Sequence, residues 1–162
     1  FAGPLADDLR LANPEATDAE VLAALDTVGA AGWVADLDDG VRTVVGEGGH
    51  ELTSAQAQQL ALARLLLLDP TVAILDEATA EAGSLGARDL ERAAAAVTEG
   101  RTTLIVAHRL TQAASADRIV VMAHGAVVEE GTHADLVSAN GRYARLWRAW
   151  AAHHADAERT RT

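Results

Sequence analysis

Lysine and cysteine are both absent from this chain, and each absence excludes a kind of site. All 13 basic residues are arginine, so a phosphate site that depends on a lysine cannot be completed from these residues. Without cysteine there is no disulfide, thiol nucleophile or cysteine-bound zinc, which is compatible with a cytoplasmic setting. No apolar run reaches the roughly 18 to 20 residues that a membrane-spanning helix needs. The chain also opens on Phe1-Ala2-Gly3-Pro4, without an initiator methionine or a signal region, so we expect it to be cut from something longer.

Composition and charge bound the class of protein. With 162 residues, of which 49% are hydrophobic, the chain has the length and apolar content of one globular domain with a buried core. The formal charge of -11 and the scattered arginines argue against a nucleic-acid surface, because phosphate contacts need clustered basic side chains. We therefore expect no nucleic-acid partner.

The first half of the chain reads as a small helical region followed by a long helix. Short helices are expected over residues 5–39, one of them capped by Asp18. Alternating apolar residues over 41–49 then lead into a glycine-rich turn. The long helix should run from Ser54 to Leu68, because Thr53 and Gln56 have the spacing of a capping box and Asp69-Pro70 ends the pattern.

The second half reads as strands and helices in alternation. Val72 to Leu75 is an apolar run short enough to be a strand buried on both faces, and residues 103–107 form a second such strand after a helix over 87–98. This order predicts a parallel strand pair joined by a right-handed crossover. Further segments follow: a hairpin of 118–122 with 126–130 around His124-Gly125, a short helix from Thr132 to Val137, and an amphipathic helix from Arg142 to Trp150.

Chemistry-bearing side chains follow both predicted strands. Asp76 and Glu77 end the first strand and His108 ends the second, so all three should lie at the carboxyl edge of the sheet, where open α/β sheets bind ligands. In phosphoryl transfer one carboxylate holds Mg²⁺ and another orients water, while an imidazole donates to a terminal phosphate. Taken singly, each has an ordinary alternative: an exposed acidic turn for Asp76-Glu77, and a local strand-end contact for His108.

The start of the long helix is a candidate anion site. Free N–H groups and the positive end of the helix dipole favour a phosphate at Thr53-Ser54-Ala55-Gln56. The alternative is a capping box with no ligand.

The order of these motifs carries more information than each motif alone. Along the chain stand Leu52-Thr53-Ser54-Ala55-Gln56, Ala61-Leu62-Ala63-Arg64, Asp69-Pro70, Ile74-Leu75-Asp76-Glu77-Ala78-Thr79 and Ala107-His108-Arg109-Leu110. In this order they resemble the nucleotide-binding domain of ABC transporters. Residues 43–49 resemble the loop that precedes the signature motif in ABC exporters, and residues 125–136 are similar to the C-terminal hairpin and helix of the family.

The resemblance implies a fold and its division. The fold class is α/β: a partial P-loop NTPase core, with parallel strands, flanking helices and a C-terminal hairpin, plus an ABC-type helical subdomain. Residues 1–69 would form the helical subdomain with the exporter-like loop and the signature helix, and residues 70–150 the C-terminal half of the ATPase core. Residues 151–162 would form a polar, frayed tail. The segments of the family that carry the phosphate loop with its lysine have no counterpart in this chain.

The resemblance also implies roles for individual residues. Asp76 would hold Mg²⁺, Glu77 would activate water and His108 would be the switch histidine at the γ-phosphate. The signature residues Leu52, Thr53, Ser54, Ala55 and Gln56 would bind the ATP held by the opposite subunit. Gly46, Glu47 and Gly48 would form the loop that couples to the membrane domain.

Two departures from the family pattern bear on the partner's site. Ser54 and Ala55 replace two glycines of the signature, and their side chains obstruct a close backbone approach to phosphate. Residues 80–83 lack the aspartate that the family has in the following loop. The resemblance therefore favours a heterodimer with one weakened site.

The expected function is that of an ATP-binding and hydrolysing part of an ABC exporter, with ATP and Mg²⁺. It would couple hydrolysis to transport through a second nucleotide-binding domain and transmembrane domains, at the cytoplasmic face of the plasma membrane, and it would be inactive alone. One alternative is a truncated, catalytically incomplete module that pairs with a complete partner. Another is a soluble ABC-type ATPase of DNA maintenance, which the exporter-like loop and the acidity disfavour.

Overall fold

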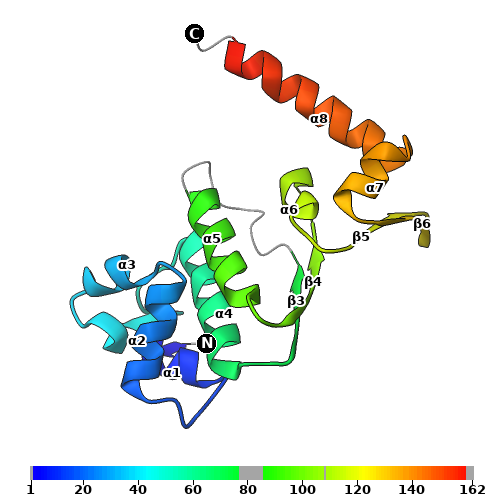
Figure 1. The fold of residues 1–162 in the computed structure, drawn as a ribbon. Coiled ribbons are helices and arrows are strands. Elements are labelled where there is room, and N and C mark those ends of the chain that lie inside the picture. The colour runs from blue at the N-terminus through cyan, green and yellow to red at the C-terminus, as the bar shows by residue number, and fades with distance from the viewer. Residues whose placement is uncertain (1, 77–85, 108, 160–162) are drawn as a thin grey trace. The chain divides into compact units, whose positions relative to one another are not determined.

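The chain forms two compact units, Phe1–Val106 and Ala107–Thr162. They are seen in a computed structural model that describes residues 2–76, 86–107 and 109–159 (Figure 1). The first unit contains, in order, β1 (Ala2–Pro4), α1 (Leu5–Arg10), α2 (Asp18–Thr27), α3 (Ala31–Ala35), η1 (Gly40–Arg42), β2 (Val44–Gly46), α4 (Ser54–Leu68), β3 (Val72–Asp76), α5 (Gly86–Thr98) and β4 (Thr102–Val106). The second contains α6 (Leu110–Ala114), β5 (Ile119–Ala123), β6 (Ala126–Gly131), α7 (His133–Ser138) and α8 (Arg142–Arg159).

Helix α4 is the centre of the first unit. It contacts α1, α2 and α5, and its Leu60 and Ala63 lie in the main apolar cluster, each at most 2% exposed. Its one charged residue, Arg64, donates from Nη1 to Oδ1 of the buried Asp8 on α1 at 3.2 Å. The helix is therefore held from several sides, as its nearly continuous apolar sequence predicts.

The helix ends confirm one prediction and correct another. Thr53 caps α4 in a capping box with Gln56, and Asp69 ends it in the left-handed conformation with φ of 42°. The prediction that Asp18 caps α2 is wrong, because the cap is Thr17, which forms a capping box with Glu20. Asp18 is the first helical residue, and its carboxylate pairs with Arg10 instead.

Strands β3 and β4 form the parallel pair that the sequence predicts. Their register runs from Val72 opposite Thr102 to Asp76 opposite Val106, and α5 lies between them in the chain. Figure 1 shows α4 and α5 packed side by side next to this pair. Leu75 faces these helices and is 6% exposed.

The prediction that β3 is buried on both faces is wrong. Ala73 and Leu75 are buried, whereas Val72 and Ile74 are 57% and 67% exposed. On the same face of β4, Leu104 is also exposed, together with Val106. The reason is that α4 and α5 cover one face of the pair, and no described element of this unit covers the other. We call Val72, Ile74, Leu104 and Val106 the open face.

The second unit is a hairpin with two helices. Strands β5 and β6 pair antiparallel and are joined by His124 and Gly125. Their φ values of 51° and 77° suit a type I′ turn, the type that two-residue hairpin loops favour. Thr132 caps α7 as predicted. Helix α8 begins at Arg142 as expected, but it continues to Arg159, beyond the predicted end at Trp150.

Glu129 joins the hairpin to α8. Its carboxylate accepts hydrogen bonds from the backbone N–H groups of Tyr143, at 2.9 Å, and Arg142. These two bonds, that of Tyr143 first, lower the pKa of Glu129 below its ordinary value. The Glu129 carboxylate lies close against Gly141, so a Cβ at that position would displace the carboxylate from its bonds. The start of α8 is thus fixed by a carboxylate from β6.

Candidate functional site

Asp76 lies at the carboxyl end of β3, as the sequence predicts. Asp76 is exposed, and it pairs with Val106 of β4 in the register of the parallel strands. Glu77 follows Asp76 directly, and His108 follows the end of β4 by two residues, but both lie outside the described residues. The meeting of these three side chains therefore stays a prediction.

A cavity of about 430 Å³ adjoins Asp76. On the strand side it is lined by Ile74, Leu75 and Asp76, and on the helix side by residues of α4 that include Gln58 and Leu65. Its walls are largely apolar, with one carboxylate where β3 ends. Of the open face, Ile74 lines this cavity, beside Asp76.

The N-terminus of α4 presents two backbone donors. The capping box uses the N–H groups of Thr53, bound to Gln56 Oε1 at 2.9 Å, and of Gln56, bound to Thr53 Oγ1 at 3.2 Å. The first helical bond of α4 runs from Ala57 N to Thr53 O at 2.9 Å. The N–H groups of Ser54 and Ala55 lie ahead of this ladder, at the positive end of the helix. The positive helix end and its free N–H groups favour an anion, and Ser54 is exposed at this end.

The glycine-rich loop before α4 is a tight turn closed by backbone bonds. Gly49 N donates to Gly46 O at 3.0 Å, and Gly48 has φ of 81°, the arrangement of a type II turn with the exposed Glu47 at its second position. Gly49 cannot carry a side chain, because a Cβ would lie 2.4 Å from Val44 O. The turn therefore projects Glu47 from the end of the β1–β2 ribbon.

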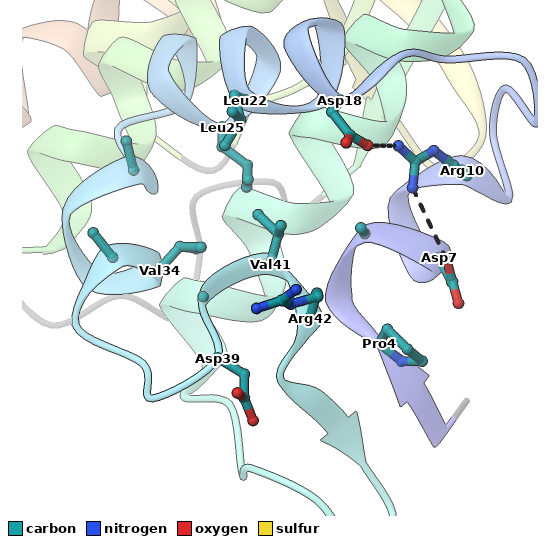
Figure 2. A pocket seen from close by; sticks show the side chains of 14 residues that line it. Pro4, Asp7, Arg10, Asp18, Leu22, Leu25, Val34, Asp39, Val41 and Arg42 are labelled. Carbon is teal, nitrogen blue, oxygen red and sulfur yellow. Dashed lines mark hydrogen bonds and ion pairs between the residues drawn. The ribbon is translucent and has the colours of Figure 1, made fainter.

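A larger cavity of about 720 Å³ lies among α1, α2, α3 and η1. Figure 2 shows the apolar side chains of Leu25 and Val41 facing it, while Arg10 lies between Asp18 and Asp7 at its edge. None of the residues predicted to act on nucleotide lines it. We assign it no part in the chemistry.

Residues 2–76, 86–107 and 109–159 contain no group of three or more acidic or histidine side chains arranged to hold a metal ion. In the same ranges, no helix is long and apolar enough to cross a membrane.

Sequence reasoning missed Gln59. This residue is 8% exposed within α4, where it bonds to α2 and α3. The signal was a polar residue directly before the apolar run that starts at Leu60, on a helix predicted to be buried on most sides.

Comparison with known proteins decides the family. The family model described as ABC transporter matches residues 6–80, which include the glycine-rich turn, the start of α4 and Asp76. The chain itself is 46% identical to a multidrug efflux ATP-binding/permease protein of Mycobacterium tuberculosis, over 149 residues that make up 92% of this chain. The chain belongs to the ABC transporter family.

Other relatives point to the same part of ABC exporters. An ATP-dependent lipid A-core flippase of Cupriavidus pinatubonensis is 47% identical over 121 residues, 75% of this chain. The structure of a bacterial Atm1-family ABC exporter with ATP bound matches 93% of the chain with a TM-score of 0.81 and 34% identity. This likeness confirms the predicted fold class: the chain is a partial ABC module with the fold of an exporter nucleotide-binding domain.

The chain spans a small share of these proteins. It covers 12% of the mycobacterial protein, 20% of the flippase and 26% of the Atm1-family chain.

Proposed function

We propose that this ABC module is the C-terminal part of an exporter's nucleotide-binding domain, where ATP binding and hydrolysis drive transport. The observation that carries the proposal is the sheet edge. Asp76 ends a strand that pairs in parallel with β4, and His108 follows β4 in the sequence. The exporter relatives support the same reading, since their names describe ATP-dependent efflux and flipping.

Within this proposal each strand-end residue has one task. Asp76 is an exposed carboxylate, the kind of oxygen ligand that Mg²⁺ prefers, and it would hold that ion. The ion, when bound, neutralises charge on the phosphates. The Glu77 carboxylate orients the attacking water and accepts its proton, and the His108 imidazole donates to the terminal phosphate.

The start of α4 serves the nucleotide of the opposite subunit. The N–H groups of Ser54 and Ala55 are the donors, and the capping box of Thr53 and Gln56 holds the first turn in shape around them. Leu52 is partly buried and packs against the core. The side chains at positions 54 and 55 keep phosphate farther from the backbone than glycines would, so we propose a heterodimer in which the partner-bound site is the slower one.

The open face is where the rest of the domain packs. Four apolar side chains on two adjacent strands are exposed together, which is the signature of a surface that another layer covers. The chain has no lysine, so the phosphate-gripping lysine must come with that missing layer. For this reason we propose that the chain alone neither grips ATP nor hydrolyses it.

Coupling to transport runs through the turn before α4. Glu47 projects from a ribbon whose shape is fixed by Gly46, Gly48 and Gly49. We propose that this turn contacts the transmembrane domains, which places the module at the cytoplasmic face of the plasma membrane. A rigid turn suits this task, because it transmits displacement instead of absorbing it.

The test is Glu77→Gln in the assembled exporter that carries this chain. The substitution keeps the shape of the side chain and removes the charge that orients water, so hydrolysis at this chain's own site should fall by orders of magnitude while nucleotide stays bound. Glu99→Gln, an exposed glutamate at the end of α5, is the matched control for loss of charge and should leave turnover unchanged. Normal turnover in Glu77→Gln would remove Glu77 from the mechanism.

A second candidate function is favoured by the missing lysine. A module of this kind can pair with a complete ATPase and supply only the α4 N-terminus, without hydrolysing anything at its own strand edge. The same experiment separates the two functions. In the second case Glu77→Gln changes nothing, whereas substitutions at Ser54 still alter the partner's turnover.

A further inference from the structure

The side chain of Gln59 on α4 bonds to α3 and to the end of α2. Its Oε1 accepts from the indole Nε1 of Trp33, on α3, at 2.9 Å. Its Nε2 donates to the carbonyls of Val28 at 3.0 Å and Gly29 at 3.1 Å, at the end of α2. With 8% of its surface exposed, the residue makes these contacts away from bulk water.

The three contacts admit a single orientation of the carboxamide. An indole N–H can only donate and a carbonyl can only accept, so reversing the amide would break all three bonds. The Val28 carbonyl, at the C-cap of α2, is one of the groups that a helix end leaves without a helical partner, and Gly29 is the next residue in the chain. Gly29, with φ of 70°, turns the chain there, and Ala30 N closes the end by donating to Leu25 O at 2.8 Å. Gln59 therefore binds the end of α2 in one orientation of its carboxamide.

The position of Gln59 along α4 gives the network its importance. Gln59 lies five positions after Ser54, about 7.5 Å along the helix axis, whereas Arg64 and its bond to Asp8 lie about 15 Å from Ser54. Apolar packing around Leu60 is not directional and tolerates small slides and rotations of a helix. Directional bonds near the helix start do not, so the Gln59 network constrains where the first turn of α4 points.

We propose that Gln59 is a positioning residue for the partner-bound ATP site. It holds α4 against the end of α2 and Trp33, so that the N–H groups of Ser54 and Ala55 meet the partner's phosphate at the required distance. Gln59 itself contacts no nucleotide and acts only through α4. This inference rests on the proposed function, because it assigns the α4 start to the partner's nucleotide.

The test measures each ATP site separately in the assembled exporter, with the catalytic carboxylate of the other site replaced by its amide. Gln59→Leu places an apolar side chain of similar size at this position in α4 and removes all three bonds. We expect turnover at the partner-bound site to fall about tenfold or more, since small displacements of a binding group carry penalties of that size, while the chain's own site keeps its rate. Trp33→Phe removes one bond and should give a smaller loss at the same site.

The control is Val21→Ala, a core substitution in α2 that touches none of the three bonds. Its thermal midpoint is compared with that of Gln59→Leu, so that loss of stability is separated from loss of position. Equal losses at both sites in Gln59→Leu, or the same partner-site loss in a Val21→Ala protein of equal stability, would overturn the proposal.

Two further outcomes are decisive. If Gln59→Leu does not assemble, Trp33→Phe decides alone: a loss confined to the partner-bound site supports the proposal, and unchanged turnover there refutes it. A Glu77→Gln exporter with normal hydrolysis at its own site would instead count against the proposed function, whatever the Gln59 variants do.

Discussion

Replacing Ile74 and Leu75 with alanine, one at a time, tests whether another layer of the complete nucleotide-binding domain packs on the open face. The two residues are neighbours on β3 and point to opposite faces of the sheet. Ile74 is 67% exposed and Leu75 is 6% exposed. Both lie within the same strand, but isoleucine is β-branched and favours strands more than leucine does, so Ile74→Ala also loses a fraction of the roughly 1 kcal/mol that the propensity scale spans.

The expected loss of unfolding free energy differs between the two substitutions, because different shares of the two side chains are buried. Full burial of an isoleucine contributes about 1.5 to 3 kcal/mol, and Ile74 is about one-third buried, so its removal should cost only about 0.5 to 1 kcal/mol in this chain. Leu75→Ala leaves a cavity against α4 and α5 and should cost about 2 to 5 kcal/mol. In the complete nucleotide-binding domain, the cost of Ile74→Ala should rise into that same range.

The assay is urea unfolding followed by tryptophan fluorescence, with each variant measured in this chain and in the complete domain. The slope of the unfolding transition must stay constant for the free energies to be compared. If Ile74→Ala costs this chain as much as Leu75→Ala, the face is not open. If its cost is no larger in the complete domain, nothing packs on the face, and the proposed missing layer is wrong.

Two other predictions follow from single sites. The lowered pKa of Glu129 means that its bonds to Tyr143 and Arg142 stabilise the fold fully above about pH 4.3, the ordinary glutamate value, and progressively less as the pH falls through the folded pKa. Urea unfolding of Glu129→Gln and wild type should therefore differ near neutral pH and converge in acid; a difference that persists below the folded pKa would contradict this. Glycine at Ser54 and Ala55 together should raise turnover at the partner-bound site, measured with the other site disabled, and a partner site that is already the faster one would contradict the asymmetry.

Local signals in the sequence were sufficient for the main elements of the fold. The capping box of Thr53 and Gln56 and the Asp69-Pro70 stop defined α4, because each satisfies a particular backbone requirement at a helix end. His124-Gly125 likewise defined the hairpin of the second unit. These features are short-range, so the sequence carries them completely.

Features that depend on tertiary contacts escaped the sequence. The apolar sequence of β3 does not show how many layers pack on the strand. The prediction that both of its faces are buried was therefore wrong. The cap of α2 fell to Thr17 because Glu20 completes its capping box, while Asp18 pairs with Arg10. Gln59 was missed because a polar residue on a helix is ordinarily assigned to the surface.

The candidate site was predicted in part. Asp76 lies at the strand end where the alternation of strands and helices put it, and the α4 start has the cap that the spacing predicts. The roles of Glu77 and His108 rest on the resemblance to ABC transporters, since both residues lie outside the described ranges. The domain boundary proposed at residue 69 also stays a prediction.

Calorimetric titration of ATP with Mg²⁺ tests the central claim, that this chain holds one part of an ATP site whose phosphate grip lies elsewhere. The chain has no lysine, and within its described residues the proposed contacts to nucleotide are the N-terminal amides of α4 and Asp76, so little holds the β- and γ-phosphates. We predict no measurable binding at low-micromolar ATP for this chain and clear binding for the complete domain. Low-micromolar affinity in this chain alone would contradict the account.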